Sequence, residues 1–359
     1  MTSRLAPQDR PPEDRRGQGG RNIVLRVFLT HTPEMRDGYY AAAPLAALRQ
    51  VAEVTLHTGD APLSGAALAR AAAGCQCIVA DRATPGTAET FAHAPDLLAF
   101  LRVAVDISTI EVPAASAAGV LVTQATPGFV DSVAELAIGM MIDLARGVSP
   151  LAGAYHRGQP PGSRMGTQLS GKTVGIIGWG RIARRLAELA AAFRMRVLVH
   201  DPYSPPDQPG IEAAGSLQQV FAQADFLVPL AVSTPETRHI VGAPAFAAMK
   251  DGAFLVNLSR GELVDEAALA AALDGGRLRG AAMDVGSAPD QRPDPALAAR
   301  PNVVATPHIG GLTPEAAEHQ AMDTVRQVAA LARGEMPPGA VNAEAAHRLR
   351  RWWQGQAAP

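Results

Sequence analysis

A glycine-rich turn between an apolar run and a helical stretch is the first place where this sequence could do chemistry. Residues 173–183 read TVGIIGWGRIA, a Gly-x-Gly-x-x-Ala fingerprint directly after an expected strand. Gly178 permits a tight turn, Gly180 lets a pyrophosphate approach the backbone, and Ala183 lets the next helix pack closely. The N-terminus of that helix would hold the phosphates. The pattern therefore predicts a dinucleotide site.

An acidic residue lies where such a site needs one. The run VLVHD ends at Asp201, 18 residues after Ala183. A carboxylate there can accept both ribose hydroxyls and repel a 2′-phosphate, which favours NAD over NADP. Two alternatives stay open on these residues alone. The turn could belong to an ordinary α/β unit in which Asp201 caps a helix, or to a methyl-donor-binding domain.

Two more polar residues follow apolar runs further along the chain. Arg260 comes after AFLVNLS, and His308 comes after NVVATP and before Ile-Gly-Gly. Ligands of open α/β sheets bind at the carboxyl ends of the strands. A guanidinium there can clamp a carboxylate in two-point geometry, and an imidazole can pass a proton to a carbonyl oxygen. The alternative for Arg260 is a surface position in a turn.

Alternating β-rich and helical stretches predict the elements that position these residues. The first series has expected strands at 23–29, 54–57, 77–80, 101–105 and 119–124, with a helix at 42–51. A second, stronger series runs from Lys172 to His308, so the fold class is α/β with two doubly wound parallel sheets. The nearly all-apolar helix 133–144 would connect the domains, a loop would span 153–170, and a helix would span about 313–331.

Composition excludes several classes of protein. The 32 Lys+Arg and 34 Asp+Glu residues give a net charge of -2, which argues against a nucleic-acid partner. No apolar run reaches the roughly 18 residues of a membrane span, so no membrane partner is expected. Cys75 and Cys77 are the only cysteines, which indicates no metal site and a reduced, cytoplasmic compartment. Residues 1–22 lack the apolar core of a secretory signal and are expected to form a disordered tail.

The chain closely resembles the D-isomer-specific 2-hydroxyacid dehydrogenase family from about Ile23 to Val341. The resemblance is carried by TVGIIGWGRIA, STPETRHIVG, AFLVNLSRGELVDEAALAAAL, GAAMDV and NVVATPHIGG, in the family's order and spacing. It implies a Rossmann NAD-binding domain inserted into a flavodoxin-like substrate domain. The expected division is a tail at 1–22, substrate domain at 23–124, NAD-binding domain at 125–308, returning substrate domain at 309–345 and a C-terminal tail at 346–359.

The resemblance also implies roles for the motif residues. Arg260 would bind the carboxylate and carbonyl oxygen of a small 2-oxo acid, and His308 would exchange the proton. Asp284 would accept a hydrogen bond from the nicotinamide carboxamide, although it could simply cap a strand end. The implied cofactor contacts are Gly178, Gly180, Arg181, Ile182, Asp201, Thr237, Leu258 and Asp284. The implied activity is NAD-dependent interconversion of a 2-oxo acid and a D-2-hydroxy acid, by a homodimer.

The chain departs from the family beside the expected histidine. The family normally has a Glu five residues after the acid that matches Asp284, but Pro289 stands there. We expect Asp290 to substitute for that Glu as a catalytic carboxylate; Gln291 is the other polar neighbour, and a solvated loop acid is the alternative. Formate dehydrogenases of the same superfamily use an Asn and a Gln where this chain has Phe129 and Pro289, so formate is not the expected substrate.

A second departure lies in the expected substrate loop. Ala104-Val105-Asp106 stands where the family commonly has Gly-x-Gly. Asp106 would repel a substrate carboxylate unless Arg82 neutralised it, so Arg82, Val105 and Asp106 are candidate substrate residues. A purely structural ion pair is the open alternative. The missing Glu also leaves open an NAD(H)-binding sensor or corepressor-like protein with weak or no catalysis, whereas retention of the Arg and His favours an enzyme.

Overall fold

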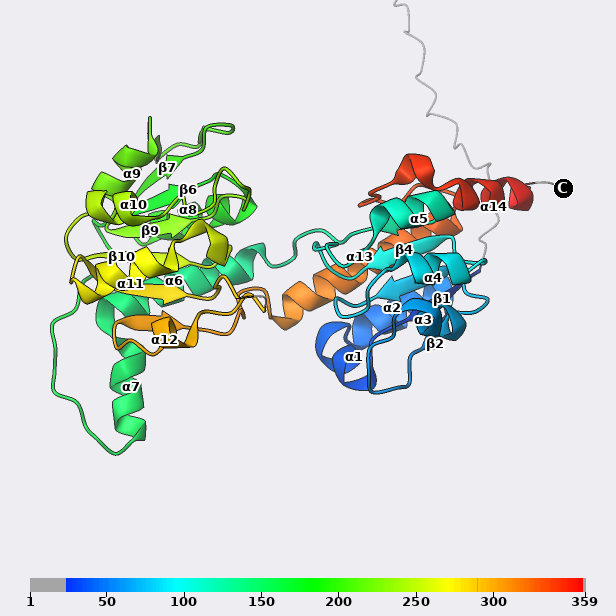
Figure 1. Cartoon of the computed structure of the whole chain (residues 1–359), viewed down its shortest axis with the longest axis horizontal. Coiled ribbons are helices and arrows are strands. Elements are labelled where there is room, and N and C mark those ends of the chain that lie inside the picture. Colours follow the sequence, from blue (N-terminus) through cyan, green and yellow to red (C-terminus); the bar gives the residue numbers. More distant parts are fainter. Residues whose placement is uncertain (1–23, 289, 358–359) are drawn as a thin grey trace, which may run out of the picture. The chain divides into compact units, whose positions relative to one another are not determined.

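The computed structural model describes residues 24–288 and 290–357, and they form two compact units (Figure 1). Unit 1 takes its described residues from the stretch that ends at Thr126 and from the stretch that begins at Ala321, whereas unit 2 runs from Pro127 to Gln320. Unit 1 is therefore discontinuous in sequence. The tail expected at 1–22 lies outside the described residues.

Unit 1 is built on a parallel sheet with the strand order β2-β1-β3-β4-β5. The order reverses beside β1, as in flavodoxin-like folds, which confirms the expected class. The strand expected at 101–105 ends instead at Arg102, because the next residues leave the ladder to form a loop. The strands are β1 (Leu25–Leu29), β2 (Ala52–Leu56), β3 (Cys77–Ala80), β4 (Ala99–Arg102) and β5 (Leu121–Thr123).

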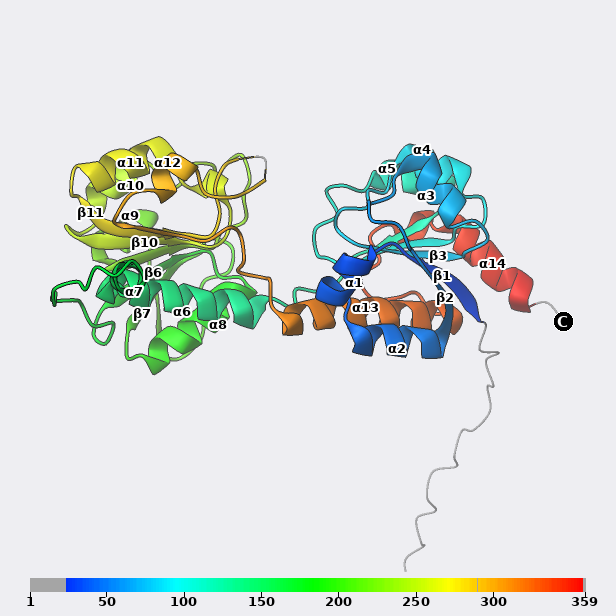
Figure 2. The ribbon, with the colours of Figure 1, turned by 90° about the horizontal axis from the view of Figure 1, so that it is seen from below.

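Helices cover both faces of this sheet (Figure 2). One face packs against Leu48, Val328 and Leu349 from three helices, and the other against Leu68, Phe91 and Ala115 from another three. The first set is α2 (Ala42–Val51), α13 (Pro314–Ala332) and α14 (His347–Ala357); the second is α3 (Gly65–Ala71), α4 (Ala88–His93) and α5 (Val112–Ala118). The short α1 (Pro33–Tyr39) follows β1.

The C-terminal part of the chain differs from the expected tail. Residues 347–357 form α14, and Leu349 is buried in the same core as α13. Trp353 donates its indole N–H to the carbonyl oxygen of Leu331 at 3.1 Å. The boundary between the units also lies inside α13, at residues 320–321, rather than at 308–309. Apolar contacts that are distant in sequence therefore stabilise a segment that the local pattern leaves unstructured.

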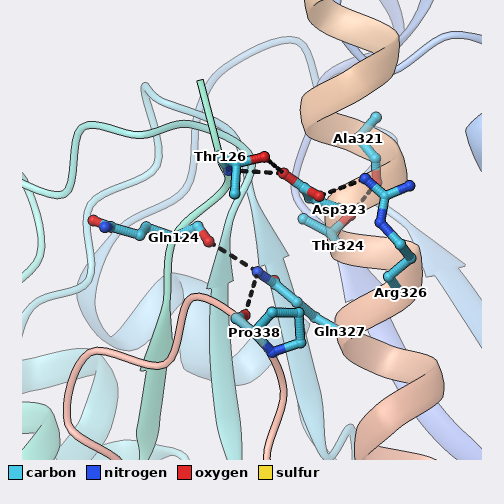
Figure 3. A network of polar contacts seen from close by, with 8 residues as sticks. All are labelled: Gln124, Thr126, Ala321, Asp323, Thr324, Arg326, Gln327 and Pro338. Atoms are coloured by element: carbon cyan, nitrogen blue, oxygen red, sulfur yellow. Dashed lines mark hydrogen bonds and ion pairs between the residues drawn. The ribbon is translucent and has the colours of Figure 1, made fainter. Parts of the chain in front are cut away.

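A polar network within unit 1 ties its two stretches together (Figure 3). The backbone N–H and hydroxyl of Thr126 donate to Asp323 Oδ2 at 2.7 and 2.6 Å, and Arg326 donates to Oδ1 at 2.5 Å. Gln327 donates to the carbonyl oxygen of Gln124 at 2.9 Å. Burial alone would raise the pKa of Asp323, but the hydrogen bonds from Thr126 and Arg326 outweigh it and lower that pKa. An ionised carboxylate thus joins the end of the first stretch to α13.

Unit 2 contains a parallel sheet with the strand order β12-β11-β10-β9-β6-β7-β8. The order reverses beside β6, as in dinucleotide-binding Rossmann folds, which confirms the second doubly wound sheet. The three-residue β8 was not expected from the sequence. The strands are β6 (Thr173–Ile177), β7 (Arg196–His200), β8 (Ile211–Ala213), β9 (Phe226–Pro229), β10 (Ala253–Asn257), β11 (Leu278–Met283) and β12 (Val303–Ala305).

The helices of unit 2 also lie on both faces of its sheet (Figure 2). α6 (Val130–Arg146) and α8 (Arg181–Ala192) share one core with the strands. The other core includes residues of α9 (Leu217–Gln223), α10 (Ala243–Ala248), α11 (Glu266–Asp274) and α12 (Pro295–Ala298). The helix expected as a connector is therefore part of the core of unit 2, where Ala134, Ala137 and Met141 are buried.

The stretch after α6 is more helical than expected. α7 (Val148–His156) extends into the loop predicted for 153–170. Within the described residues, no single helix is long and apolar enough to cross a membrane, and only α6 and α7 taken together, across a bend of 72°, meet that test by length and composition.

Candidate functional site

The glycine loop after β6 has the geometry that the fingerprint predicts. Gly178 has a φ of +96°, and a Cβ there would stand 2.8 Å from the backbone nitrogen of Ala231, so a larger residue would not fit. Gly180 precedes α8, where no described side chain caps the helix. Around the position of a Cβ on Gly180, the described part of the chain leaves open space out to 4 Å. This open, uncapped helix end fits a pyrophosphate.

Asp201 follows β7 and lies against the glycine loop. Its Oδ2 accepts the backbone N–H of Trp179 at 2.7 Å, and its Oδ1 accepts those of Tyr203 and Ser204, both at 2.9 Å. Burial alone would raise the pKa of Asp201, but these backbone hydrogen bonds outweigh it and lower that pKa. A fixed, ionised carboxylate beside the loop fits the expected ribose contact.

The other expected cofactor residues follow strands or begin a helix of unit 2. Arg181 is exposed and Ile182 half-buried in the first turn of α8. Thr237 shapes the turn after β9, because its hydroxyl donates to the carbonyl oxygen of Val232 at 2.6 Å. Leu258 is buried directly after β10. Since β9 is the neighbour of both β6 and β10, these positions share the carboxyl edge with the glycine loop.

Arg260 lies exposed after β10 on a backbone that Asn257 fixes. The buried Asn257 donates from Nδ2 to the carbonyl oxygen of Arg260 at 2.9 Å and accepts the N–H of Ser259 at 3.1 Å. One guanidinium nitrogen of Arg260 donates to the carbonyl oxygen of Ser259 at 2.8 Å. Sequence reasoning missed Asn257. The available signal was a polar residue at the end of an apolar strand, directly before the motif arginine.

His308 and Asp284 follow the next two strands of the sheet. Asp284, after β11, is only 1% exposed and accepts hydrogen bonds from Thr306, Ile309 and Gly310. His308, after β12, is half-buried and has a φ of +60°. Because β10, β11 and β12 are adjacent and parallel, the fold brings Arg260, Asp284 and His308 to one edge of the sheet. The expected carboxamide contact of Asp284 stays a prediction.

The loop that lacks the family's Glu is described except at Pro289. Asp290 is 61% exposed, accepts the N–H of Arg292 at 3.1 Å and lies 3.9 Å from its guanidinium. Gln291 has a φ of +59°, and its buried Oε1 has no hydrogen-bond partner among the described residues. The support of His308 by Asp290 therefore stays a prediction, and Gln291 is the neighbour with an unused buried acceptor.

In unit 1, the expected substrate residues lie at the carboxyl edge of the sheet. Arg82 and Asp106 form an ion pair of 3.1 Å, with side chains 57% and 34% exposed. Asp106 also accepts the N–H of Ser108 at 2.9 Å. Burial alone would raise the pKa of Asp106, but Ser108 and Arg82 outweigh it and lower that pKa. The ion pair that both interpretations require is thus present, next to a half-buried Val105, and a role in substrate binding stays a prediction.

A buried polar cluster lies behind these loops, and sequence reasoning missed it. Arg102 donates to the carbonyl oxygens of Asp81 and Thr84 and to the hydroxyl of Thr109. Burial lowers the pKa of its guanidinium to about 10. His31 is 1% exposed, and its Nδ1 has no hydrogen-bond partner in the described part of the chain. Burial lowers the pKa of His31 to about 4, against the opposing attraction of Asp81.

Within residues 24–288 and 290–357, no three His, Cys, Asp or Glu side chains are grouped so that they could hold a metal ion. The fold and the glycine loop of unit 2 define a dinucleotide-binding α/β protein.

Comparisons with known proteins narrow this class. The sequence profile of the NAD-binding domain of D-isomer specific 2-hydroxyacid dehydrogenases matches residues 138–310. D-3-phosphoglycerate dehydrogenase of Methanocaldococcus jannaschii is 34% identical over 299 residues, covering 82% of this chain and 56% of that protein. (S)-Sulfolactate dehydrogenase of Chromohalobacter salexigens is 37% identical over 272 residues, covering 73% and 86%. The structure of apo D-lactate dehydrogenase from Escherichia coli matches with a TM-score of 0.75 and 26% identity, covering 88% and 100%.

The chain belongs to the D-isomer specific 2-hydroxyacid dehydrogenase family. Unit 2 carries the family's NAD-binding domain, and NAD is its cofactor. The chain spans about half the length of the phosphoglycerate dehydrogenases that it matches.

Proposed function

We propose that this chain is an NAD-dependent oxidoreductase that interconverts a small 2-oxo acid and a D-2-hydroxy acid. The observation that carries the proposal is the placement of Arg260 and His308 after β10 and β12, at the same sheet edge as the open glycine loop. This edge is where ligands of doubly wound folds bind. A carboxylate-binding guanidinium and a proton-exchanging imidazole are what reduction of a 2-oxo acid requires.

The residues at this sheet edge have different roles in the proposed reaction. The helix end at Gly180 and the carboxylate of Asp201 would hold the cofactor, which would supply a hydride when bound as NADH. Arg260 binds the carboxylate of the substrate and so orients the substrate. Asn257 fixes the backbone that carries Arg260. His308 donates a proton to the carbonyl oxygen as that oxygen gains negative charge.

In unit 1, we propose that Arg82, Val105 and Asp106 select the substrate. The ion pair neutralises Asp106, so a substrate carboxylate meets less repulsion than the sequence alone suggests. The same proposal includes a homodimer. It also includes a reducing, cytoplasmic compartment, which fits the two free, buried cysteines of the described residues.

The test is the oxidation of NADH or NADPH in the presence of a panel of 2-oxo acids, including phosphorylated and sulfonated ones. We expect turnover of at least one acid with NADH and almost none for His308→Asn. NADH binding without turnover of any acid would contradict the proposal and favour a sensor or corepressor-like protein.

A further inference from the structure

Asp284 is a buried acid whose contacts converge on one loop. Its Oδ1 accepts the hydroxyl of Thr306 at 2.6 Å and the N–H of Ile309 at 2.8 Å, and its Oδ2 accepts the N–H of Gly310 at 2.7 Å. These donors flank His308 on both sides. Both oxygens of the carboxylate therefore accept hydrogen bonds from the segment that carries the imidazole.

The backbone of His308 needs such support. Its φ of +60° lies in the left-handed region, which is unfavourable for a side-chain-bearing residue. Residues held in this region persist where the surrounding contacts fix them. The N–H of His308 donates to the carbonyl oxygen of Thr306 at 3.0 Å, and the N–H of Thr306 donates to that of Met283 at 3.0 Å. The loop is thus tied to β11 before His308 and to Asp284 on both sides of it.

Asp284 is itself rigidly placed. Its N–H donates to the carbonyl oxygen of Asn257 at 3.0 Å, so its backbone is attached to the end of β10. At 1% exposure the carboxylate has little access to solvent. Its negative charge makes it a stronger hydrogen-bond acceptor than a neutral oxygen would be. A neutral amide in its place would offer one acceptor oxygen instead of two.

We propose that Asp284 is a positioning residue, whose carboxylate holds His308 in its left-handed conformation. The inference rests on the proposed function for the role of His308. It assigns to Asp284 a role in addition to the carboxamide contact that the family resemblance implies.

Two variants and a conservative control test the proposal. Asp284→Asn removes an acceptor oxygen, and Thr306→Val removes one donor while keeping the acid; Thr306→Ser keeps the hydroxyl. We expect kcat to fall about 100-fold for Asp284→Asn, because catalytic groups misplaced by about 1 Å lose that much. We expect a fall of about 10-fold for Thr306→Val, as for a lost hydrogen bond to a charged group, and recovery in Thr306→Ser. The Kd of NADH should stay within about twofold of the unmodified protein in both Thr306 variants, which keep the carboxylate.

Weakened NADH binding with an unchanged kcat at saturating NADH would overturn the proposal and assign Asp284 to the nicotinamide. A second measurement does not depend on turnover: amide hydrogen exchange of a peptide that contains Ile309 and Gly310 should accelerate in Asp284→Asn and not in Thr306→Ser. Unchanged exchange in Asp284→Asn would also overturn it. If the unmodified protein reduces no 2-oxo acid, the proposed function fails, while the exchange result still decides whether Asp284 holds the loop.

Discussion

The buried His31 predicts a specific loss of stability in acid. The pKa of its imidazole is lowered from 6.5 to about 4, chiefly by burial, while Asp81 opposes this effect and Arg36 and Arg102 reinforce it. The folded state therefore keeps His31 neutral at pH values where the unfolded chain binds a proton. The contribution of neutral His31 to the free energy of unfolding is fully present above about pH 6.5, and it is lost progressively as the pH drops towards 4. At about 1.4 kcal/mol per pH unit, the full loss is about 3 kcal/mol.

The matched variant is His31→Phe, which keeps an aromatic ring beside Tyr40, whose ring centroid lies 5.1 Å from that of His31. Trp352 and Trp353 belong to unit 1 and Trp179 to unit 2, so urea unfolding followed by tryptophan fluorescence in a Trp179→Phe background reports on unit 1. The free energy of unfolding of His31→Phe, relative to its parent, should increase by about 3 kcal/mol between pH 7.5 and 4. The same difference at both pH values would refute the reasoning, whatever its absolute size.

Three further predictions concern the candidate site. The unmodified protein should prefer NADH, and Asp201→Ser should weaken that preference; equal kcat/KM with NADH and NADPH before substitution would contradict the assignment. Arg260→Lys should lose about 3 kcal/mol of transition-state stabilisation in kcat/KM while NADH binding survives, because an ammonium cannot reproduce the planar two-point clamp; unchanged kinetics would make Arg260 structural. If Asp290 supports protonated His308, Asp290→Asn should move the high-pH fall-off of oxo-acid reduction to lower pH. A profile that moves only in Gln291→Leu would assign that support to Gln291.

Those parts of the fold that have strong local patterns could be predicted from the sequence. The apolar run before Gly178 and the helix after it define the glycine loop almost by themselves. β8 could not be predicted in this way, because two of its three residues are exposed and it depends on pairing with β7. α14 is rich in arginine, and it is packing of Leu349 and the two adjacent tryptophans onto a distant core that makes it helical.

Some residues of the candidate site could likewise be predicted from local motifs, whereas others depend on contacts made only in the folded chain. Arg260 and His308 are recognisable because each follows an apolar strand in a familiar motif. Asn257 could not be assigned its task, because its partners become visible only once the loop after β10 has folded back on it. The sequence predicts that Arg82 lies near Asp106, 24 residues away in sequence, but it leaves open whether this pair serves the substrate or only the structure.

The discontinuity of unit 1 has a consequence for synthesis on the ribosome. Unit 2 is continuous in sequence and can fold as soon as it emerges from the ribosome. The sheet of unit 1 is fully covered only after α13 and α14 have been synthesised. At about 5–20 residues per second, translation of residues 127–320 takes about 10–40 s. During that time Val27, Leu29 and Leu101 lack the α13 residues that later cover them. Only α2 can cover this apolar sheet face of the nascent chain for many seconds, so a block in translation before α13 should leave a chaperone-bound or aggregating intermediate.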